Sequence, residues 1–274
     1  MAAVPIDNPG DVRLDDYRNV PDGELLRTRG IFVAEGRLVV RRLLTESRLR
    51  ARSAMLTPGA HTALADVLSQ RPDLPVYVVS QLVMDGVTGF NIHRGCLAIG
   101  ERPEPMPWQA VLTQLKPEAT MVVLERVSNA DNVGGVFRNA AAFGAGAVLV
   151  DNASTDPLYR KSIRTSMGAA LVMPFAHVEN VPAVLAELRR CEFALVALTP
   201  APTAMELRAC ASAIGGRRRA IILGHEGDGL SAAALAACDY HARISMATWV
   251  DSLNVASAAA VALYELGSGP HTWK

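Results

Sequence analysis

Three short loops carry most of the side chains of this chain that could do chemistry, and each follows an apolar, strand-like stretch. In the first loop, Asn132 and Arg138 lie six residues apart and enclose the pair Gly134-Gly135. Paired glycines leave backbone amides bare, which suits an anion such as a phosphate, and an arginine fork can hold a phosphate or a carboxylate. Asn132 and Arg138 can share one helix-start region. A polar helix cap beside a solvated arginine is the alternative interpretation.

The second loop, Leu223 to Ser231, alternates three glycines with three polar side chains. It is neither a P-loop nor the Gly-x-Gly-x-x-Gly fingerprint of dinucleotide-binding proteins. Glycines directly after an apolar strand favour close approach of the backbone to a ligand over an ordinary turn. His225 is a candidate general base in this loop. No serine, cysteine or carboxylate partner lies at a recognisable spacing, and a histidine in a loop is more often a surface residue.

The third loop, Ile244 to Asn254, precedes a long run rich in alanine and valine that ends at Leu266 and has helical periodicity. Asp251, Ser252 and Asn254 place three polar side chains at the start of this apolar helix. Such side chains either cap the helix or hold a ligand at its positive end. The spacing alone leaves both interpretations open.

The apolar runs predict the elements that position these loops. From residue 107 onwards strands alternate with helices, which indicates an α/β domain with a mostly parallel sheet covered on both faces. The predicted strands are Met121–Glu125, Ala147–Asp151, Leu171–Val178, Phe193–Leu198, Ala220–Leu223 and Ala242–Ser245. The predicted helices span about 134–143, 158–167, 182–190, 204–213, 231–238 and 252–266. Ligand sites in such sheets lie beyond the carboxyl ends of the strands, where the three loops fall, and Thr199 with Pro200 is a fourth candidate.

The first hundred residues form a smaller α/β unit in this interpretation. Predicted strands at 31–36, 54–57, 76–79 and 96–100 alternate with helices at 37–47 and 60–69. Three prolines at alternate positions between Arg102 and Pro107 cannot join a helix or a central strand, so this stretch is the predicted linker. We therefore predict two domains, residues 1–106 and 107–274.

Composition narrows the class of protein further. Half of the 274 residues are hydrophobic, and 27 Lys and Arg balance 27 Asp and Glu, so net charge alone does not announce nucleic-acid binding. The sequence shows neither a signal peptide nor a membrane-spanning run. The four cysteines are scattered, and no motif indicates a metal, which favours a reduced, cytoplasmic location over a disulfide scaffold or a zinc site.

Arginines cluster in spite of the neutral balance. Six of them between Arg37 and Arg52 are opposed only by Glu46, and two further basic clusters lie at residues 160–164 and 217–219. A solvated charged face is the usual outcome for such runs, but the excess of arginine over acid favours a surface for a polyanion. The candidate residues of such a polyanion-binding surface are Arg37, Arg41, Arg42 and Arg164.

Taken together, the three loops resemble the three motifs of the SpoU/TrmH family of RNA ribose 2′-O-methyltransferases, within the SPOUT superfamily. Asn132, Gly134 and Arg138 match the first motif, and Leu223 to Leu230 matches the second. The third is matched at Ile244, Met246, Ser252, Leu253, Asn254 and Val255, and Lys161 to Gly168 is a fourth match. The resemblance covers roughly residues 120–266. The N-terminal section resembles a substrate-binding domain with a ribosomal-protein-like fold that many members carry.

This resemblance implies a domain whose C-terminal segment is threaded into a trefoil knot and whose loops bind S-adenosylmethionine. By matched position, largely through backbone atoms, the cofactor-binding residues are Thr199, Leu223, Gly224, Glu226, Ile244, Met246 and Leu253. The implied catalytic residues are Arg138, Asn132, Glu226, Ser252 and Asn254. The resemblance also implies a homodimer formed through the C-terminal domain, with the alanine-rich final helix as a candidate surface.

The implied reaction is attack of a ribose 2′-hydroxyl of structured RNA on the sulfonium methyl group, without a metal. The family assigns proton removal to the residue matching Arg138, but guanidinium normally stays protonated, so Arg138 is also a candidate phosphate anchor and alkoxide stabiliser. The N-terminal domain favours rRNA as the substrate. The alternatives are a tRNA 2′-O-methyltransferase and a catalytically inactive RNA-binding factor of ribosome assembly, whereas the missing fingerprint disfavours a dinucleotide-dependent enzyme.

Three positions depart from the family pattern. Ser245 replaces the usual proline, Thr248 stands where glycine is common, and Ala256 replaces a common serine. The first two lie in the third loop, where they are expected to affect the affinity for the cofactor.

Overall fold

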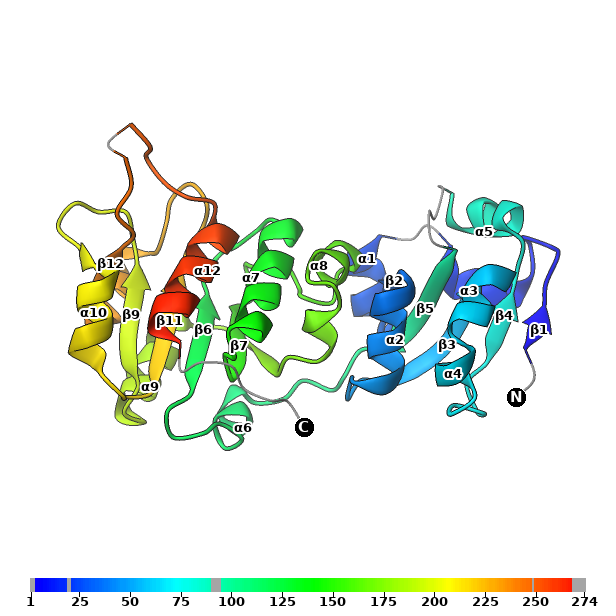
Figure 1. Ribbon diagram of the computed structural model, residues 1–274, viewed down its shortest axis with the longest axis horizontal. Helices are drawn as coiled ribbons and strands as arrows, with labels where there is room; N and C mark the ends of the chain where they lie inside the picture. The colour runs from blue at the N-terminus through cyan, green and yellow to red at the C-terminus, as the bar shows by residue number, and fades with distance from the viewer. Residues whose placement is uncertain (1–2, 19–20, 90–94, 248, 268–274) are drawn as a thin grey trace. The chain divides into compact units, whose positions relative to one another are not determined.

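Two β-sheets organise the chain, and each belongs to a separate unit of the computed structural model (Figure 1). The structure describes residues 3–18, 21–89, 95–247 and 249–267. Unit 1 comprises Met1–Glu104 together with Leu158–Val172, and unit 2 comprises Pro105–Pro157 together with Met173–Lys274. The alternation of apolar runs with helical stretches thus gives mixed α/β structure in both halves of the sequence, as predicted.

Unit 1 is built on a five-stranded sheet in the order β1-β4-β3-β5-β2. The pairs β1–β4 and β3–β4 are parallel, whereas β5 runs antiparallel to both β2 and β3. The strands are β1 Val4–Pro5, β2 Ile31–Glu35, β3 Ala51–Leu56, β4 Val76–Val78 and β5 Cys96–Glu101. The helices are α1 Asp22–Glu24, α2 Arg37–Thr45, α3 Pro58–Ala63, α4 Ala65–Leu68 and α5 Gln81–Thr88, with a 3-10 helix at Val12–Tyr17 and a π-helix at Leu25–Arg29. The sequence did not predict α5, although Ser80 caps it and Gly89 ends it in a left-handed conformation.

Unit 1 also contains a segment that follows β7 in the chain. Leu158–Val172 holds α8 (Arg160–Thr165) and a 3-10 turn at Ala169–Leu171, and α8 contacts β2. Two side chains of the α2 region bind its backbone: Arg42 Nη1 donates to Met167 O at 2.7 Å, and Ser47 Oγ donates to Leu171 O at 2.6 Å. The helix was predicted, but its place in unit 1 was not, because 107–274 was expected to form one domain.

Unit 2 is built on seven strands, all parallel, in the order β10-β12-β9-β11-β6-β7-β8. The predicted parallel sheet is confirmed. Its strands are β6 Thr120–Leu124, β7 Ala147–Asp151, β8 Phe175–Val178, β9 Ala194–Leu198, β10 Met205–Glu206, β11 Arg219–Leu223 and β12 Tyr240–Arg243. Its helices are α6 Trp108–Leu112, α7 Ala130–Ala142, α9 Val181–Arg190, α10 Leu207–Ile214, α11 Ala232–Ala237 and α12 Val255–Leu266.

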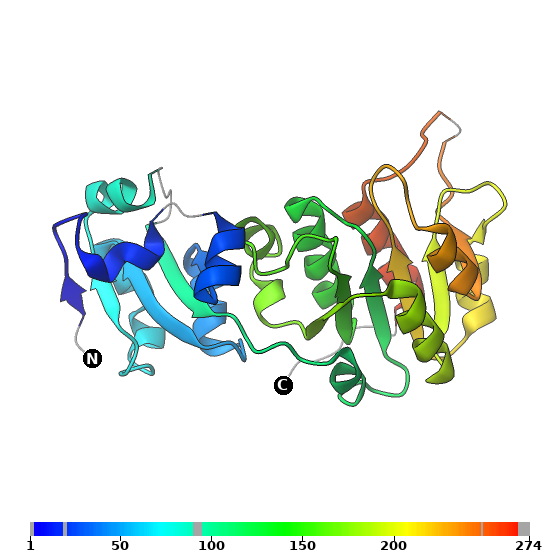
Figure 2. The same ribbon diagram turned by 180° about the vertical axis from the view of Figure 1, so that it is seen from behind.

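Helices cover both faces of this sheet, so its central strands are buried and apolar on both sides. Figure 1 shows α7, α10 and α12 over one face, and Figure 2 shows α9 and α11 over the other. The last strand, β12, lies between β9 and β10, and the chain then returns over the sheet to α12, which packs on α7 and contacts β11. This return path brings the third loop beside the second.

Several local predictions differ from the structure. The strand predicted at Leu171–Val178 is shorter, because Ala169–Leu171 forms a 3-10 turn and pairing with β7 begins at Phe175. The helix predicted from residue 204 begins at Leu207, since Met205 and Glu206 pair with β12. Helix α6 directly follows Pro107 and was not predicted. In the part of the chain that the structure describes, none of the helices is long and apolar enough to cross a membrane.

Candidate active site

The carboxyl ends of three neighbouring strands of unit 2 surround a cavity of about 270 Å³. Loops from β9, β11 and β12 and the start of α12 supply its walls. Every residue predicted to bind the cofactor lines it, namely Thr199, Leu223, Gly224, Glu226, Ile244, Met246 and Leu253. Ser252 and Asn254 of the predicted catalytic set line it as well. The structure therefore brings together residues that lie up to 55 positions apart in the sequence (254 minus 199).

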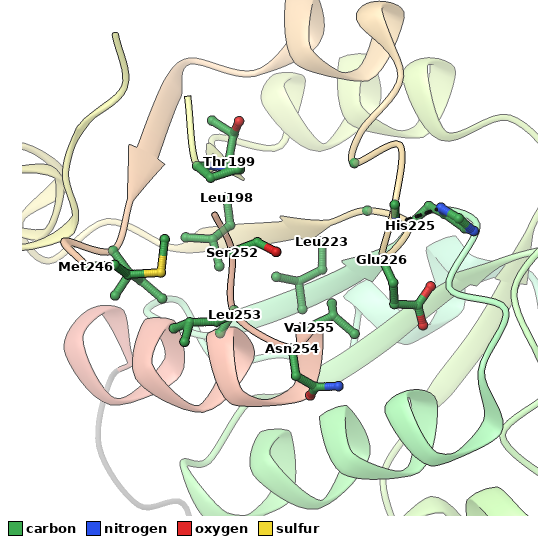
Figure 3. A pocket seen from close by; sticks show the side chains of 16 residues that line it. Leu198, Thr199, Leu223, His225, Glu226, Met246, Ser252, Leu253, Asn254 and Val255 are labelled. Atoms are coloured by element: carbon green, nitrogen blue, oxygen red, sulfur yellow. Dashed lines mark hydrogen bonds between the residues drawn. The ribbon is translucent and has the colours of Figure 1, made fainter. Parts of the chain in front are cut away.

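The walls of this cavity differ in chemistry. Leu198, Leu223, Met246 and Leu253 form an apolar side, whereas Glu226 lies at the opposite end (Figure 3). The last turn before α12 supplies the further polar groups of Ser252 and Asn254. A ligand with a flat apolar part and a charged or polar part suits this arrangement.

The second loop makes a tight turn that only glycine permits at its start. A Cβ atom on Gly224 would lie 2.4–2.6 Å from backbone atoms of Gly229 and Leu230. Gly229 itself has φ +67°, a left-handed conformation. Reciprocal backbone hydrogen bonds between His225 and Gly229 close the turn. The glycines thus serve close approach of one backbone stretch to another.

A chain of hydrogen bonds joins the three predicted loops. Asn254 caps α12, because its Oδ1 accepts from the backbone N–H of Ala256 at 2.9 Å and of Ser257 at 3.3 Å. Its Nδ2 then donates to Asn132 Oδ1 at 2.7 Å, and Asn132 Nδ2 donates to Glu226 Oε1 at 2.6 Å. The capping hydrogen bonds orient the side-chain amide of Asn254, and that amide in turn orients the side-chain amide of Asn132. Asn254 therefore caps the helix and also lines the cavity, and binding of a ligand by the third loop stays a prediction.

Helix α7 meets α12 along a single face. Asn132, Gly135 and Asn139 lie on that face, and Asn139 Nδ2 donates to Ala256 O at 2.7 Å. A Cβ atom on Gly135 would approach Ala256 Cβ to 2.6 Å, so the two helices pack closely here. The small side chain of Ala256, one of the three departures, sits at this contact.

Arg138 lies apart from the cavity lining. Helix α7 begins at Ala130, with Asn129 as its cap, so Asn132 is in the first turn and Arg138 is in the third. The expected shared helix start is therefore wrong for Arg138. Its side chain is exposed, and it makes no hydrogen bond or ion pair within the described part of the chain. The guanidinium remains available for a ligand.

Two buried acids at strand ends were not predicted as site residues. Glu125 follows β6 and accepts from Ser231 N at 2.7 Å and from Ser231 Oγ at 2.8 Å. Asp151 ends β7, and its Oδ1 accepts from Arg126 N at 2.9 Å. These carboxylates hold the first and second loops in place. An acidic residue that ends an apolar strand is a signal that could have identified them.

The arginines predicted to bind RNA differ in their surroundings. Arg41 forms two hydrogen bonds with Asp66, at 2.6 and 2.9 Å, which lower the pKa of that carboxyl. Arg42 binds Met167 O, and Arg164 lies 3.9 Å from Glu35. Arg37 is exposed and makes no such contact with the described residues.

The arginine cluster at 217–219 has structural contacts. Arg217 donates to the hydroxyl of Tyr240, and the Arg218 guanidinium lies 4.3 Å from the ring centre of Phe193. Arg219 is buried and donates to Leu266 O at 2.7 Å, where the carboxyl end of α12 carries partial negative charge. Burial lowers the pKa of Arg219. These three side chains therefore contact other residues of unit 2, and they do not line the cavity.

The other departures lie in the third loop. The Ser245 hydroxyl donates to the carboxylate of Glu206, which also pairs with Arg243. This contact ties the start of the loop to the edge strand β10. Thr248 lies outside the described residues.

A parallel α/β sheet with a ligand cavity beyond its carboxyl ends defines a class of small-molecule-binding enzyme domains. Residues 119–264 match the model of the SpoU rRNA methylase family. An uncharacterized tRNA/rRNA methyltransferase of Mycobacterium bovis is 40% identical over 271 residues, which is 96% of this chain and 91% of that protein. A 23S rRNA (guanosine-2′-O-)-methyltransferase of Bordetella pertussis is 30% identical over 72% of this chain and 79% of its own length. The chain belongs to the SpoU rRNA methylase family.

A solved structure agrees with this fold. The S-adenosylmethionine-bound rRNA methyltransferase of Sinorhizobium meliloti superposes with a TM-score of 0.80 at 23% identity and covers 96% of this chain and 97% of its own. The family resemblance predicted from the three loops is confirmed.

Proposed function

We propose that this protein transfers a methyl group from S-adenosylmethionine to a ribose 2′-hydroxyl of structured RNA, and that the RNA is ribosomal. Family membership makes it an S-adenosylmethionine-dependent RNA methyltransferase. The 2′-hydroxyl target is supported by the name of the Bordetella relative. The observation that carries the proposal is the cavity in which all seven residues matched to the cofactor meet the Asn254–Asn132–Glu226 hydrogen bonds.

The residues of the cavity fit S-adenosylmethionine. Leu198, Leu223 and Leu253 offer an apolar wall for a flat purine ring, and the polar end can hold the charged amino-acid part. Gly224 permits the tight turn that places the backbone of the second loop in the cavity wall. S-adenosylmethionine, when bound, supplies the methyl group on a sulfonium centre.

The side chains of the chain itself have distinct tasks in this proposal. Asn132 and Asn254 fix the carboxylate of Glu226 at the cavity wall. Ser252, which lines the cavity, orients the ribose. Arg138, exposed and unpaired among the described residues, anchors the substrate phosphate and stabilises negative charge on the 2′-oxygen. Fixed orientation of this kind provides much of the rate of a transfer reaction.

Three wider features belong to the same proposal. The return of the chain from β12 to α12 supports a trefoil knot. Unit 1 supports a substrate-binding role through its exposed arginines, of which Arg37 has no partner among the described residues.

The outer face of α12 exposes Val261 by 41% and Tyr264 by 75%, which supports a homodimer formed through unit 2. Sedimentation velocity would test the dimer, with Tyr264→Asp expected to yield monomer.

Methylation of RNA by the purified protein tests the proposal directly. We would incubate it with radiolabelled S-adenosylmethionine and total RNA, separate rRNA from tRNA, and digest the labelled fraction to nucleosides. We expect 2′-O-methylated nucleoside from rRNA, and far less from a parallel reaction with Arg138→Ala. Label in tRNA alone would identify the other substrate class. Binding of RNA without binding of S-adenosylmethionine in calorimetry would instead indicate an inactive RNA-binding factor.

A further inference from the structure

The side chain of His225 supports the middle of the second loop. Residues 224–229 contain three glycines, so ordering this stretch costs more conformational entropy than ordering an average loop. The backbone hydrogen bonds between His225 and Gly229 close its ends. Within the turn, His225 Nδ1 accepts from the backbone N–H of Gly227 at 3.0 Å and of Asp228 at 3.1 Å.

These two hydrogen bonds specify the state of the imidazole ring. A ring nitrogen that accepts hydrogen bonds carries a lone pair, so the ring is neutral and its proton is on Nε2. The lone pair of Nδ1 is occupied by the turn, and Nε2 carries a hydrogen. His225 therefore has no free basic nitrogen in this arrangement. Figure 3 shows the ring and the Glu226 side chain leaving the loop in different directions.

The turn held by His225 carries Glu226. This residue lies between His225 and the two amides that His225 binds, and its Oε1 accepts from Asn132 Nδ2 at 2.6 Å. The charged groups around the turn are Asp228, whose Oδ2 lies 4.0 Å from Nδ1, and Arg126. Arg126 donates to Gly229 O at 3.1 Å and lies 3.8 Å from Asp228 Oδ2. A proton on Nδ1 would abolish both accepted hydrogen bonds and draw the ring towards Asp228.

We propose that His225 is a positioning residue that holds the second loop, and with it Glu226, in the shape that binds S-adenosylmethionine. It acts through two accepted backbone hydrogen bonds and not as a general base. This inference rests on the proposed function for the identity of the ligand. The geometry of the turn is independent of that function.

Matched substitutions separate this role from catalysis. His225→Asn keeps a side-chain oxygen that can accept from the backbone two residues on, and asparagine does this commonly in turns. We expect its dissociation constant for S-adenosylmethionine to stay within about threefold of the natural protein. His225→Ala removes the acceptor, and we expect affinity to fall about tenfold while kcat at saturating cofactor changes little. If His225 were a general base, both variants would lose kcat and would keep their affinity for S-adenosylmethionine.

Nitrogen-15 NMR of the histidine rings in the full-length protein completes the test without cofactor. The resonances of His225, identified by their loss in His225→Asn, should show a bare Nδ1 and a protonated Nε2 at neutral pH. The opposite tautomer, or unchanged affinity in His225→Ala, would overturn the inference. Failure of the natural protein to bind S-adenosylmethionine would overturn the proposed function, while the tautomer would still decide whether His225 holds the turn.

Discussion

At the scale of single residues, Arg138 and Asn132 illustrate two ways in which a side chain can serve a site. Arg138 is exposed and unpaired among the described residues, whereas Asn132 is 7% exposed and bonded on both sides. The first is available to a substrate. Asn132 is hydrogen-bonded within the protein and acts through the side chains of Glu226 and Asn254.

Replacement of Arg138 by alanine should slow methyl transfer severely without weakening the binding of the cofactor. Its guanidinium does not line the cavity, so calorimetry should give a dissociation constant for S-adenosylmethionine within about twofold of the natural protein. Loss of one group that stabilises developing charge costs about a hundredfold to a thousandfold in rate. Single-turnover rates would measure the loss. Transfer at the normal rate would show that Arg138 has no part in the reaction.

Replacement of Asn132 by alanine should weaken both the site and the fold. The change leaves the Asn254 amide and the Glu226 carboxylate without their shared partner, at a cost of about 1–3 kcal/mol. Asn139→Ala is the matched control, because Asn139 also joins α7 to α12 but bonds only Ala256 O. Both variants should unfold at lower urea concentration, but only Asn132→Ala should bind S-adenosylmethionine less tightly. Equal affinities would refute the role of the hydrogen-bond chain.

At the scale of elements, the segment Leu158–Val172 is flanked in the sequence by stretches of unit 2 but forms part of unit 1. Gly168, which lies between α8 and the 3-10 turn of this segment, has φ +82° and faces Arg42 and Val39 of α2. The left-handed conformations of Met167 and Gly168 turn the chain after α8, where the carbonyls of Met167 and Leu171 meet Arg42 and Ser47. The integrity of unit 1 thus depends on this glycine.

Substitution of Gly168 by alanine tests that dependence. An L-residue in the left-handed region costs about 1–2 kcal/mol, and the new Cβ would approach Arg42 Cδ to 3.3 Å. We expect a lower urea midpoint. Gly59→Ala is the control in the same unit, since it lies in α3 with nothing within 4 Å and should be neutral or slightly stabilising. A midpoint unchanged by Gly168→Ala would show that the segment tolerates another backbone path.

At the scale of the whole molecule, stability should depend on pH in the alkaline range. Burial raises the pKa of the Cys96 thiol from 9.0 to about 12. In the unfolded chain this thiol loses its proton first, so the native state binds more protons and stability falls as pH rises from about 9 towards 12. The contribution is fully present below pH 9.

Chemical denaturation at several pH values would measure this effect. At about pH 10 the loss due to Cys96 should approach 1.4 kcal/mol, one unit above the pKa of the unfolded thiol. Cys96→Ala should show a shallower decline between about pH 8 and pH 10, whatever its stability at neutral pH. Parallel declines would mean that Cys96 is not protected from ionisation in the native protein.

Much of unit 2 was predictable because its pattern is local. Apolar runs of four to six residues gave β6, β7, β9 and β11 to within a residue or two, and the glycine-rich and asparagine-rich loops after them gave the candidate site. Unit 1 was less predictable at its start, where the short strand β1 pairs with the distant β4 and the 3-10 helix at Val12–Tyr17 packs against α5 and β5. Two-residue strands such as β1 and β10 carry no periodic signal of their own.

The sequence by itself determined the types of residue in the three loops, their place after apolar strands, and the family they indicate. Tertiary structure alone decided the Asn254–Asn132–Glu226 hydrogen bonds and the presence of Leu158–Val172 in unit 1. The physical reason is distance along the chain. Periodicity reports which face of an element is buried, but contacts between residues 94 to 125 positions apart arise only when the parallel sheet and its return segment bring their loops together.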